Sequence, residues 1–478
     1  MPHPLLLEIN TRCWLRALAD HSGRTATLAD APETEFASWK ERGFTHIWLM
    51  GVWATGPKTR DLARAQPNLQ ALSAQAFGKR GAEKLVSSPY AVADFTVAES
   101  LGGAPALRQF RADLHRHGLG LVLDFIPNHL GLDHGWLTEK NSLFVRSAAP
   151  RPETFPVAHA GATSWVAHGK DPYFPAWIDT AQLDYRQAAT RAAMTEALLS
   201  VASQCDGVRC DAAMLVLNHV FDKTWRHYPN GVEAPPGEFW AEAISTVRRR
   251  QPEFMFIAEA YWDLEPRLQA LGFDFVYDKK FLDHLTRREY HALQRHLRAV
   301  CGKFHPVRFL ENHDEARIAS LLSVPEQKAA AVLLLAQPGI RLLHEGQWAG
   351  HRRHTPVQFA DHWPETGNPE MTAFYERLLS SLARTVIGNG EMDFCETGLP
   401  HCFAMKWEGE ARRISLAVVN LAPHRADFQI RDFEYGGEWA NVFSENDSSW
   451  TWRDSGLHIQ LAGHGFALLE LRPAVRST

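Results

Sequence analysis

The segment Gly207–Asp211, GVRCD, places a carboxylate two residues after an arginine at the end of a predicted strand. Side chains two residues apart in a strand lie on the same face. We therefore expect Arg209 to pair with Asp211, to lower the pKa of its carboxyl group and to leave the carboxylate free to act as a nucleophile. Taken alone, such a pair is more typical of a structural ion pair, because Arg/Asp pairs are common on protein surfaces.

Three other apolar segments also end in polar residues that could do chemistry. These residues are Asp124, Asn128 and His129 in DFIPNH, Glu259 in FIAEA, and His313 and Asp314 in FLENHD. Asp211 lies 48 residues before Glu259, and Glu259 lies 55 residues before Asp314. This spacing corresponds to strands four, five and seven of a regular strand–helix repeat, whose C-terminal ends meet at one edge.

Short apolar segments alternate with amphipathic helices along the chain, which is the pattern of a parallel sheet covered by helices. The predicted helices include Glu33–Gly43, Ala104–His117 and Gln187–Gln204. The predicted strands are Leu5–Leu15, Phe44–Trp53, Leu119–Ile126, the segment around Val208, Glu253–Ala260, Phe273–Asp278, Pro306–Asp314 and Gly339–Glu345. Eight strand–helix repeats favour an α/β fold of the (β/α)8 TIM barrel type.

Two long segments, residues 54–101 and 128–182, follow the second and third predicted strands, where a barrel builds its site. After about residue 388 the pattern changes to period-two alternation, which is typical of antiparallel strands. We therefore predict a catalytic barrel of residues 1–127 and 183–387, an inserted domain of residues 128–182 and a C-terminal β-sandwich domain of residues 388–478.

The composition indicates a globular enzyme-sized chain of 478 residues, of which 45% are hydrophobic and 22% charged. A net charge of -5 gives no basic field, so nucleic acid and anionic membrane surfaces are disfavoured as partners. The chain has no run of 18 apolar residues, which argues against a membrane span. Its 16 Trp and 26 Phe suit neutral ligands such as sugars, although most of them are expected in the core. The oligomeric state stays open.

The cysteines are scattered without CxxC spacing, so neither a zinc site nor a disulfide framework is indicated. We expect reduced core thiols at Cys13, Cys205, Cys210, Cys301, Cys395 and Cys402. The N-terminal segment MPHPLLLEINTRCWL has no charged region followed by a long apolar run, so no signal peptide is predicted. These features predict a cytoplasmic protein.

DFIPNH, GVRCD, FIAEA and FLENHD resemble, in order and spacing, the four conserved sequence regions of the α-amylase superfamily, glycoside hydrolase family 13. SSPYAVADF at residues 87–95, QLDYR at 182–186 and GIRLLHEGQ at 339–347 resemble further segments of that family. The resemblance spans nearly the whole chain. It implies a barrel with an inserted domain after strand three and a C-terminal β-domain.

The resemblance implies that Asp211 is the nucleophile, Glu259 the general acid/base and Asp314 a third carboxylate that binds sugar hydroxyls in the transition state. A retaining glycosidase needs one ionised and one protonated carboxyl about 5 Å apart. We expect Arg209 to lower the pKa of Asp211. The apolar neighbours and facing carboxylates of Glu259 are expected to raise its pKa.

Other side chains are expected to bind the sugar or support the acids. His129 and His313 are predicted to donate hydrogen bonds to hydroxyls, and Tyr90 to stack beneath the cleaved sugar. Asp124 and Asn128 are predicted to support the site without touching the substrate. The residues predicted to bind substrate are Tyr90, His129, Arg209, His313, Tyr261 and Trp262, of which the last two could form a platform for the leaving group or pack within their loop.

Met214 and Leu215 stand where many α-amylases have Lys-His, a pair linked to the leaving group and to calcium. Asn128 matches another calcium ligand of the family, but one oxygen is far short of the six to eight that calcium takes. We therefore predict no obligatory metal and no cofactor.

Three functions fit these residues. The first is retaining hydrolysis of α-glucosidic linkages in malto-oligosaccharides or related α-glucans. The second is transfer by a transglycosylase, glucanotransferase or phosphorylase-type enzyme on the same α-glucosides, including sucrose or trehalose, since loops around the site choose the acceptor. The third is a non-catalytic binding protein, which is disfavoured because all three acids are present.

Overall fold

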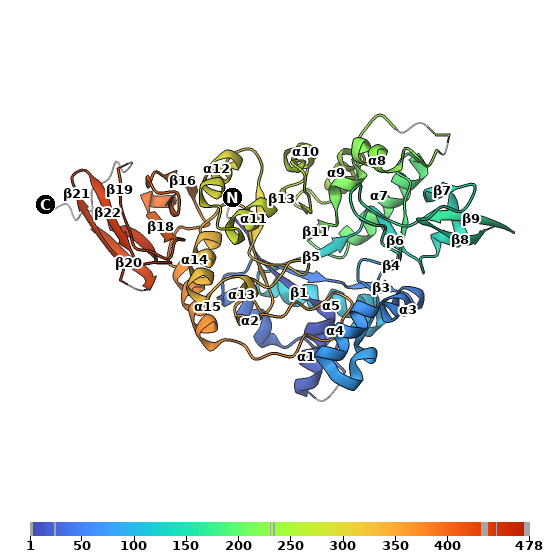
Figure 1. Cartoon of the computed structure of the whole chain (residues 1–478), viewed down its shortest axis with the longest axis horizontal. Coiled ribbons are helices and arrows are strands. Elements are labelled where there is room, and N and C mark those ends of the chain that lie inside the picture. The colour runs from blue at the N-terminus through green and yellow to red at the C-terminus, as the bar shows by residue number, and fades with distance from the viewer. Residues whose placement is uncertain are drawn as a thin grey trace.

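The computed structural model describes residues 3–22, 25–159, 161–229, 231–232, 235–431, 438–445 and 447–472. In this part of the chain, eight parallel strands close into a barrel in the order β1-β15-β14-β13-β12-β11-β5-β2 (Figure 1). The strands are β1 (Leu5–Asn10), β2 (His46–Met50), β5 (Gly120–Phe125), β11 (Gly207–Cys210), β12 (Met255–Ala258), β13 (Phe275–Tyr277), β14 (Pro306–Phe309) and β15 (Ile340–His344). The predicted (β/α)8 fold is confirmed.

Helices cover the outside of the barrel and bury one face each. On α5 (Gly103–Arg116), Leu107, Phe110 and Leu114 are buried, as their helical spacing predicts. The other helices are α1 (Thr11–Ser22), α2 (Glu33–Glu41), α7 (Ala188–Ala202), α8 (Asn218–Trp225), α9 (Phe239–Arg248), α10 (Glu265–Ala270), α11 (Lys279–Thr286), α12 (Tyr290–Val300), α13 (Ile318–Leu321), α14 (Val324–Leu335) and α15 (Pro369–Leu382). The barrel strands are therefore enclosed on both faces.

The first predicted strand, Leu5–Leu15, is too long. β1 ends at Asn10 and α1 begins at Thr11. The Thr11 hydroxyl donates to the Met50 carbonyl at 2.9 Å, and the Cys13 amide donates to Asn10 Oδ1 at 3.4 Å, so the chain turns at the barrel rim. Over so few residues, an apolar helix face and an apolar strand have the same pattern.

The second predicted strand, Phe44–Trp53, is divided in two. β2 ends at Met50, and β3 (Trp53–Thr55) pairs with β4 (Val92–Val97) outside the barrel. Gly51 stands between them with a φ of 84°, a conformation that favours glycine. The turn directs residues 54–101 away from the barrel, where they form α3 (Pro57–Ala65) and α4 (Pro67–Phe77) before β4 returns.

The segment of residues 128–182 stands beside the C-terminal ends of the strands, on the right in Figure 1. β6 (His129–Gly131) and β10 (Thr180–Gln182) pair at its base. A three-stranded sheet of β7 (Arg146–Ser147), β9 (Ala162–Ala167) and β8 (Thr154–His159) extends beyond them, and α6 (Trp136–Glu139) lies between. The chain leaves the barrel at the end of β5, and the next barrel strand, β11, begins at Gly207. The domain limits at residues 128 and 182 stay a prediction.

The C-terminal part lies at the opposite end of the molecule (Figure 1) and contains a five-stranded and a three-stranded antiparallel sheet. The first sheet has the order β16 (Glu391–Cys395), β17 (Cys402–Glu408), β18 (Ile414–Asn420), β23 (Phe466–Arg472), β20 (Glu438–Glu445), and the second β19 (Ala426–Ile430), β22 (Gly456–Leu461), β21 (Ser449–Arg453). The predicted antiparallel β-domain is confirmed.

All six cysteines are free thiols. Five of them are buried, but Cys301 is exposed at the end of α12. The prediction of a core thiol is therefore wrong for Cys301. The spacing of cysteines along the sequence does not show that Cys301 follows the end of a helix.

Candidate active site

Arg209 lies at the centre of the carboxylates that the strand ends bring together. Its Nη1 lies 2.7 Å from Asp211 Oδ1 and 3.5 Å from Asp124 Oδ1, and its Nη2 lies 2.7 Å from Glu259 Oε2. The Arg209 side chain is only 1% exposed. One buried guanidinium thus holds acids from the ends of three neighbouring strands, β5, β11 and β12, as the motif spacing predicts.

Aromatic rings surround this guanidinium within the barrel. Its carbon lies 5.3 Å from the ring centre of Trp48, 5.4 Å from that of Tyr90 and 5.7 Å from that of Tyr277. Such rings attract a cation and exclude water from it. Sequence reasoning missed Trp48 and Tyr277, although both are large polar-tipped aromatics on barrel strands.

Glu259 is fixed by three donors. Arg209 Nη2 and the Ala212 amide both bind its Oε2, at 2.7 and 2.6 Å, and the Tyr261 hydroxyl donates to its Oε1 at 2.7 Å. Ala212 has a φ of 40°, an uncommon conformation for a residue with a side chain, and it directs its amide at the acid. Burial raises the pKa of Glu259 and Arg209 opposes this, and the net shift is upward, as predicted.

Asp211 departs from the sequence-based expectation. Burial raises the pKa of Asp211 and Arg209 lowers it, and the net shift is upward rather than downward. The expected lowering is therefore wrong in direction, because the cost of burying the charge exceeds the attraction of an arginine that also serves Glu259 and Asp124. Burial likewise raises the pKa of Asp124 to about 7.

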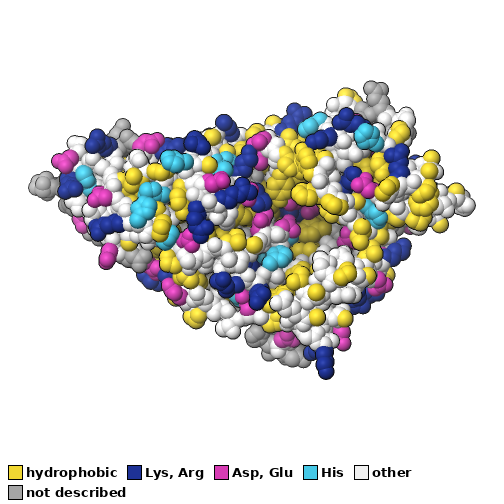
Figure 2. All heavy atoms as spheres, viewed as in Figure 1, with side chains coloured by type: hydrophobic (Ala, Val, Ile, Leu, Met, Phe, Trp, Pro, Cys, Tyr) yellow, Lys and Arg dark blue, Asp and Glu magenta, His cyan; other side chains and the backbone are white. Residues whose placement is uncertain are grey.

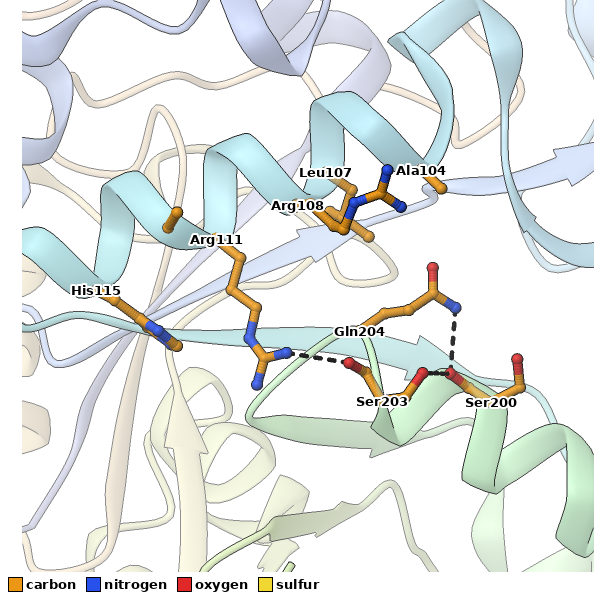
Figure 3. Close-up of a pocket in the computed structure, with 9 residues that line it drawn as sticks. Ala104, Leu107, Arg108, Arg111, His115, Ser200, Ser203 and Gln204 are labelled. Atoms are coloured by element: carbon orange, nitrogen blue, oxygen red, sulfur yellow. Dashed lines mark hydrogen bonds between the residues drawn. The ribbon is translucent and has the colours of Figure 1, made fainter.

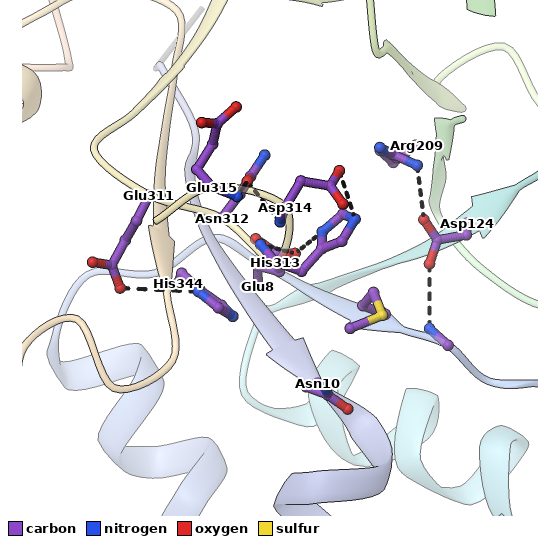
Figure 4. A network of polar contacts seen from close by, with 12 residues as sticks. Glu8, Asn10, Asp124, Arg209, Glu311, Asn312, His313, Asp314, Glu315 and His344 are labelled. Carbon is purple, nitrogen blue, oxygen red and sulfur yellow. Dashed lines mark hydrogen bonds and ion pairs between the residues drawn. The ribbon is translucent and has the colours of Figure 1, made fainter. Parts of the chain in front are cut away.

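His313 and Tyr90 connect the third carboxylate to the barrel wall, and Figure 4 shows His313 beside Asp314. His313 Nε2 lies 3.1 Å from Asp314 Oδ2 and 2.7 Å from the Tyr90 hydroxyl, and the Tyr90 and His313 rings stack with centres 5.2 Å apart. The Asp314 side chain is 50% exposed, so it reaches the opening of the barrel. Burial acts to raise the pKa of Asp314, but His313 outweighs it and the pKa is lowered.

The residues of the predicted DFIPNH motif divide between two places. Asp124 joins the acids, and it also accepts from the Gly51 amide at 3.3 Å. Asn128 instead exchanges hydrogen bonds with Gln182 across the base of the inserted segment, at 3.0 and 3.2 Å. Asn128 therefore contacts the base of the inserted segment, where β6 and β10 pair, and not the acids. Its partner Gln182 was not predicted as a site residue.

His129 starts β6 and is buried, with its ring centre 5.0 Å from that of Trp177. Burial lowers the pKa of His129 to about 4, so the ring is neutral at neutral pH. A neutral imidazole donates one hydrogen bond, which suits the predicted contact with a sugar hydroxyl.

Tyr261 and Trp262 follow Glu259 on the same loop. Trp262 is 36% exposed and has a φ of 68°, and its ring meets that of Tyr173 at 5.0 Å. Tyr173 comes from the inserted segment and is 58% exposed. The loop that follows Glu259 and the inserted segment therefore form one aromatic surface, which the sequence did not connect.

The space-filling view shows a hollow near the middle of this face with acidic and apolar side chains in it, in the region where Figure 1 places β5 and β11 (Figure 2). Another pocket lies outside the barrel between α5 and α7 (Figure 3). There Arg111 is engaged by Asp206 at 2.6 Å and by the Ser203 carbonyl at 3.2 Å. That pocket contains none of the predicted site residues.

The protein-family model of the α-amylase catalytic domain matches residues 39–376 of this chain. The chain belongs to the α-amylase superfamily. It is 26% identical over 291 residues to the α-amylase MalA of Haloarcula japonica and 22% identical over 319 residues to an α-glucosidase of Culex pipiens. These matches cover 58% and 54% of this chain, but only 39% and 52% of the two relatives.

The α-amylase fold extends over the whole structure. The maltogenic α-amylase AmyB of Thermotoga neapolitana superimposes with a TM-score of 0.73 over 98% of this chain and 99% of that one, at 19% identity. At this identity the likeness shows the fold alone. The family match includes all four motifs, which lie between Asp124 and Asp314.

The α-amylase motif positions Met214 and Leu215 are both buried, at 3% exposure. Among the described residues, no group of three or more His, Cys, Asp or Glu side chains is arranged to hold a metal ion. Metal independence stays a prediction.

We expect treatment with a chelator to change the melting temperature and the activity by less than the error of the measurement. A large loss that calcium restores would contradict it.

Proposed function

We propose that the protein is a retaining α-glycoside hydrolase that acts on α-glucosidic linkages of malto-oligosaccharides or related α-glucans. The observation that carries this proposal is the shared Arg209 guanidinium, whose two terminal nitrogens each lie 2.7 Å from a carboxyl oxygen, one of Asp211 and one of Glu259. Retaining glycosidases need two carboxyls about 5 Å apart. The shared guanidinium supports this role for Asp211 and Glu259, because it holds both side chains beside one another.

In the proposed reaction, Asp211 attacks the anomeric carbon as the bond to the glycosidic oxygen breaks. Glu259 gives its proton to that oxygen. In the second step Glu259 removes a proton from water, the water oxygen attacks the anomeric carbon, and Asp211 departs with retention of the α configuration. The Asp314 carboxylate, held by His313, is proposed to bind sugar hydroxyls.

The position of the acid proton follows from the contacts of Glu259. Its Oε2 accepts hydrogen bonds from Arg209 and the Ala212 amide. The proton therefore belongs on Oε1, which contacts the Tyr261 hydroxyl at 2.7 Å. Burial raises the pKa of Glu259, which is the direction that a general acid requires.

Product analysis tests the proposal. Maltose, maltotriose, sucrose, trehalose and starch are incubated with the enzyme, with and without phosphate, and NMR identifies the first anomer released. We expect α-configured glucose or short malto-oligosaccharides and no effect of phosphate. A glucosyl phosphate formed only with phosphate would identify a phosphorylase. Longer oligosaccharides formed from maltotriose with no net gain in reducing ends would identify a transferase.

The aromatic surface of Trp262 and Tyr173 is proposed to bind the leaving-group sugar, because it adjoins the loop that carries Glu259. Trp262→Ala is expected to lower kcat/KM for maltotriose by about 10-fold, which corresponds to loss of one aromatic contact. Hydrolysis of α-glucosyl fluoride should change less than 2-fold, roughly, because fluoride occupies none of this surface. Equal losses on both substrates would place Trp262 elsewhere in the reaction.

The protein is further proposed to act in the cytoplasm. All six thiols are free, which supports a reducing compartment. No helix in the described ranges has the length and apolar character needed to cross a bilayer.

A further inference from the structure

Glu8 is a charged residue inside the otherwise apolar core of β1, LLLEIN, and it is 0% exposed. Its Oε1 lies 2.5 Å from His313 Nδ1, although the two residues are 305 positions apart in the chain. Burying a carboxylate without a partner is costly, so this contact is the reason that β1 tolerates an acid. Sequence reasoning missed Glu8.

The two nitrogens of His313 face two different acids (Figure 4). Nδ1 faces Glu8, while Nε2 lies 3.1 Å from Asp314 Oδ2 and 2.7 Å from the Tyr90 hydroxyl. A ring nitrogen that faces a carboxylate oxygen makes a favourable contact when it carries a proton that it can donate. The geometry therefore suits the imidazolium, which donates on both sides.

We propose that Glu8 is a positioning residue that keeps His313 doubly protonated, so that its Nε2–H holds Asp314 in place for the substrate. This proposal rests on the proposed function, because it assigns Asp314 a part in binding sugar. Glu8 itself does not touch the reacting atoms. It acts through the imidazole ring of His313, which comes from the loop after β14.

The charges around His313 favour the cation. Burial acts to lower the pKa of His313, but Asp314 and Glu8 raise it, and the net pKa is well above the usual value. His344 is itself driven neutral, since burial and then Arg317 lower its pKa well below the usual value. The titratable groups facing the ring or its backbone are Glu8, Tyr90, Asp124, Asp211, Asp314, His344 and His354.

Glu8→Gln tests the proposal because glutamine has the same shape and its side-chain oxygen still accepts from Nδ1. Without the Glu8 charge, the pKa of His313 falls, and the neutral ring presents an unprotonated Nε2 to Asp314. We therefore expect the pH at which His313 loses its second proton, followed by nitrogen-15 NMR, to fall by about 1 to 3 units. The loss of activity above that pH should be in KM more than in kcat if Asp314 mainly loses its orientation.

Glu311→Gln is the matched control. Glu311 is also 0% exposed, but it binds Arg317 at 2.7 Å and the Ile318 amide at 2.6 Å. This variant removes a buried charge near the same end of the barrel, and the pH of His313 deprotonation should stay in place. If Glu8→Gln leaves that pH unchanged as well, or if both variants move it equally, Glu8 has only a structural role.

A measurement on the unaltered enzyme covers the case in which Glu8→Gln fails to fold. Nitrogen-15 NMR of the protein labelled in histidine, with the His313 signals assigned from His313→Gln, reports the protonation of each ring nitrogen. We expect both His313 nitrogens to carry protons at pH 8. A neutral His313 at pH 7 would overturn the proposal, and this result would not depend on any turnover.

Discussion

Asp211→Asn is expected to lower turnover of malto-oligosaccharides by about 10⁴-fold or more, because an amide cannot form the glycosyl-enzyme ester. The asparagine oxygen can still accept the hydrogen bond that Arg209 now gives Asp211 at 2.7 Å, and Arg209 keeps its contact with Glu259 Oε2. Sugar binding measured by calorimetry should therefore remain, and the melting temperature should change little. A rate within tenfold of the unaltered enzyme would remove Asp211 from the nucleophile's role.

Asp184→Asn provides a matched control for that variant. Asp184 is also buried, at 1% exposure, and it pairs at 2.8 Å with an arginine two residues away, Arg186. It lies outside the acid cluster, in the segment that returns from the insertion to the barrel. We expect this variant to lose stability while the folded fraction keeps its activity, which separates loss of a buried charge from loss of the nucleophile.

Glu259→Gln is expected to abolish oligosaccharide hydrolysis but to spare the first step on α-glucosyl fluoride. A sugar leaving group needs the proton of Glu259, whereas fluoride departs without it. Hydrolysis of the intermediate should then be slow, because the same residue activates water. Azide needs no such help, so it should restore turnover of the fluoride and give α-glucosyl azide with retention.

The azide experiment also distinguishes the two acids. Asp211→Asn should give no retained azide product, because no intermediate forms. If azide fails with Glu259→Gln and instead rescues another acidic variant at the opening of the barrel to the retained product, then Glu259 is not the acid/base. The Tyr261 hydroxyl and the Ala212 amide would then hold Glu259 for a structural purpose only.

The electrostatic expectations show where sequence reasoning ends. The pairing of Arg209 with Asp211 follows from strand periodicity, and the structure has it at 2.7 Å. The direction of the Asp211 pKa does not follow, because it depends on burial and on how many acids share one arginine. Both quantities are set by β5 and β12, whose residues are far from the motif in the chain.

Glu8 also shows a contact that sequence reasoning could not identify. A single acid in LLLEIN is a visible signal of the kind that identified the other strand ends, yet nothing near Glu8 in the chain names its partner. The contact with His313 exists because β1 closes the barrel between β2 and β15. The aromatic surface of Trp262 and Tyr173 likewise exists only because the inserted segment packs against the loop that follows Glu259.

Periodicity and motif spacing along the chain are enough to predict the eight-strand barrel, the antiparallel C-terminal domain and the strand-end acids Asp211, Glu259 and Asp314 as candidates. The points at which β1 and β2 end, the set of acids that share Arg209, and the contact of Glu8 and Asp314 with one imidazole appear only in the folded chain. Those features depend on burial and on charges that closure of the barrel brings together, and electrostatic energies follow distance in space rather than distance along the chain.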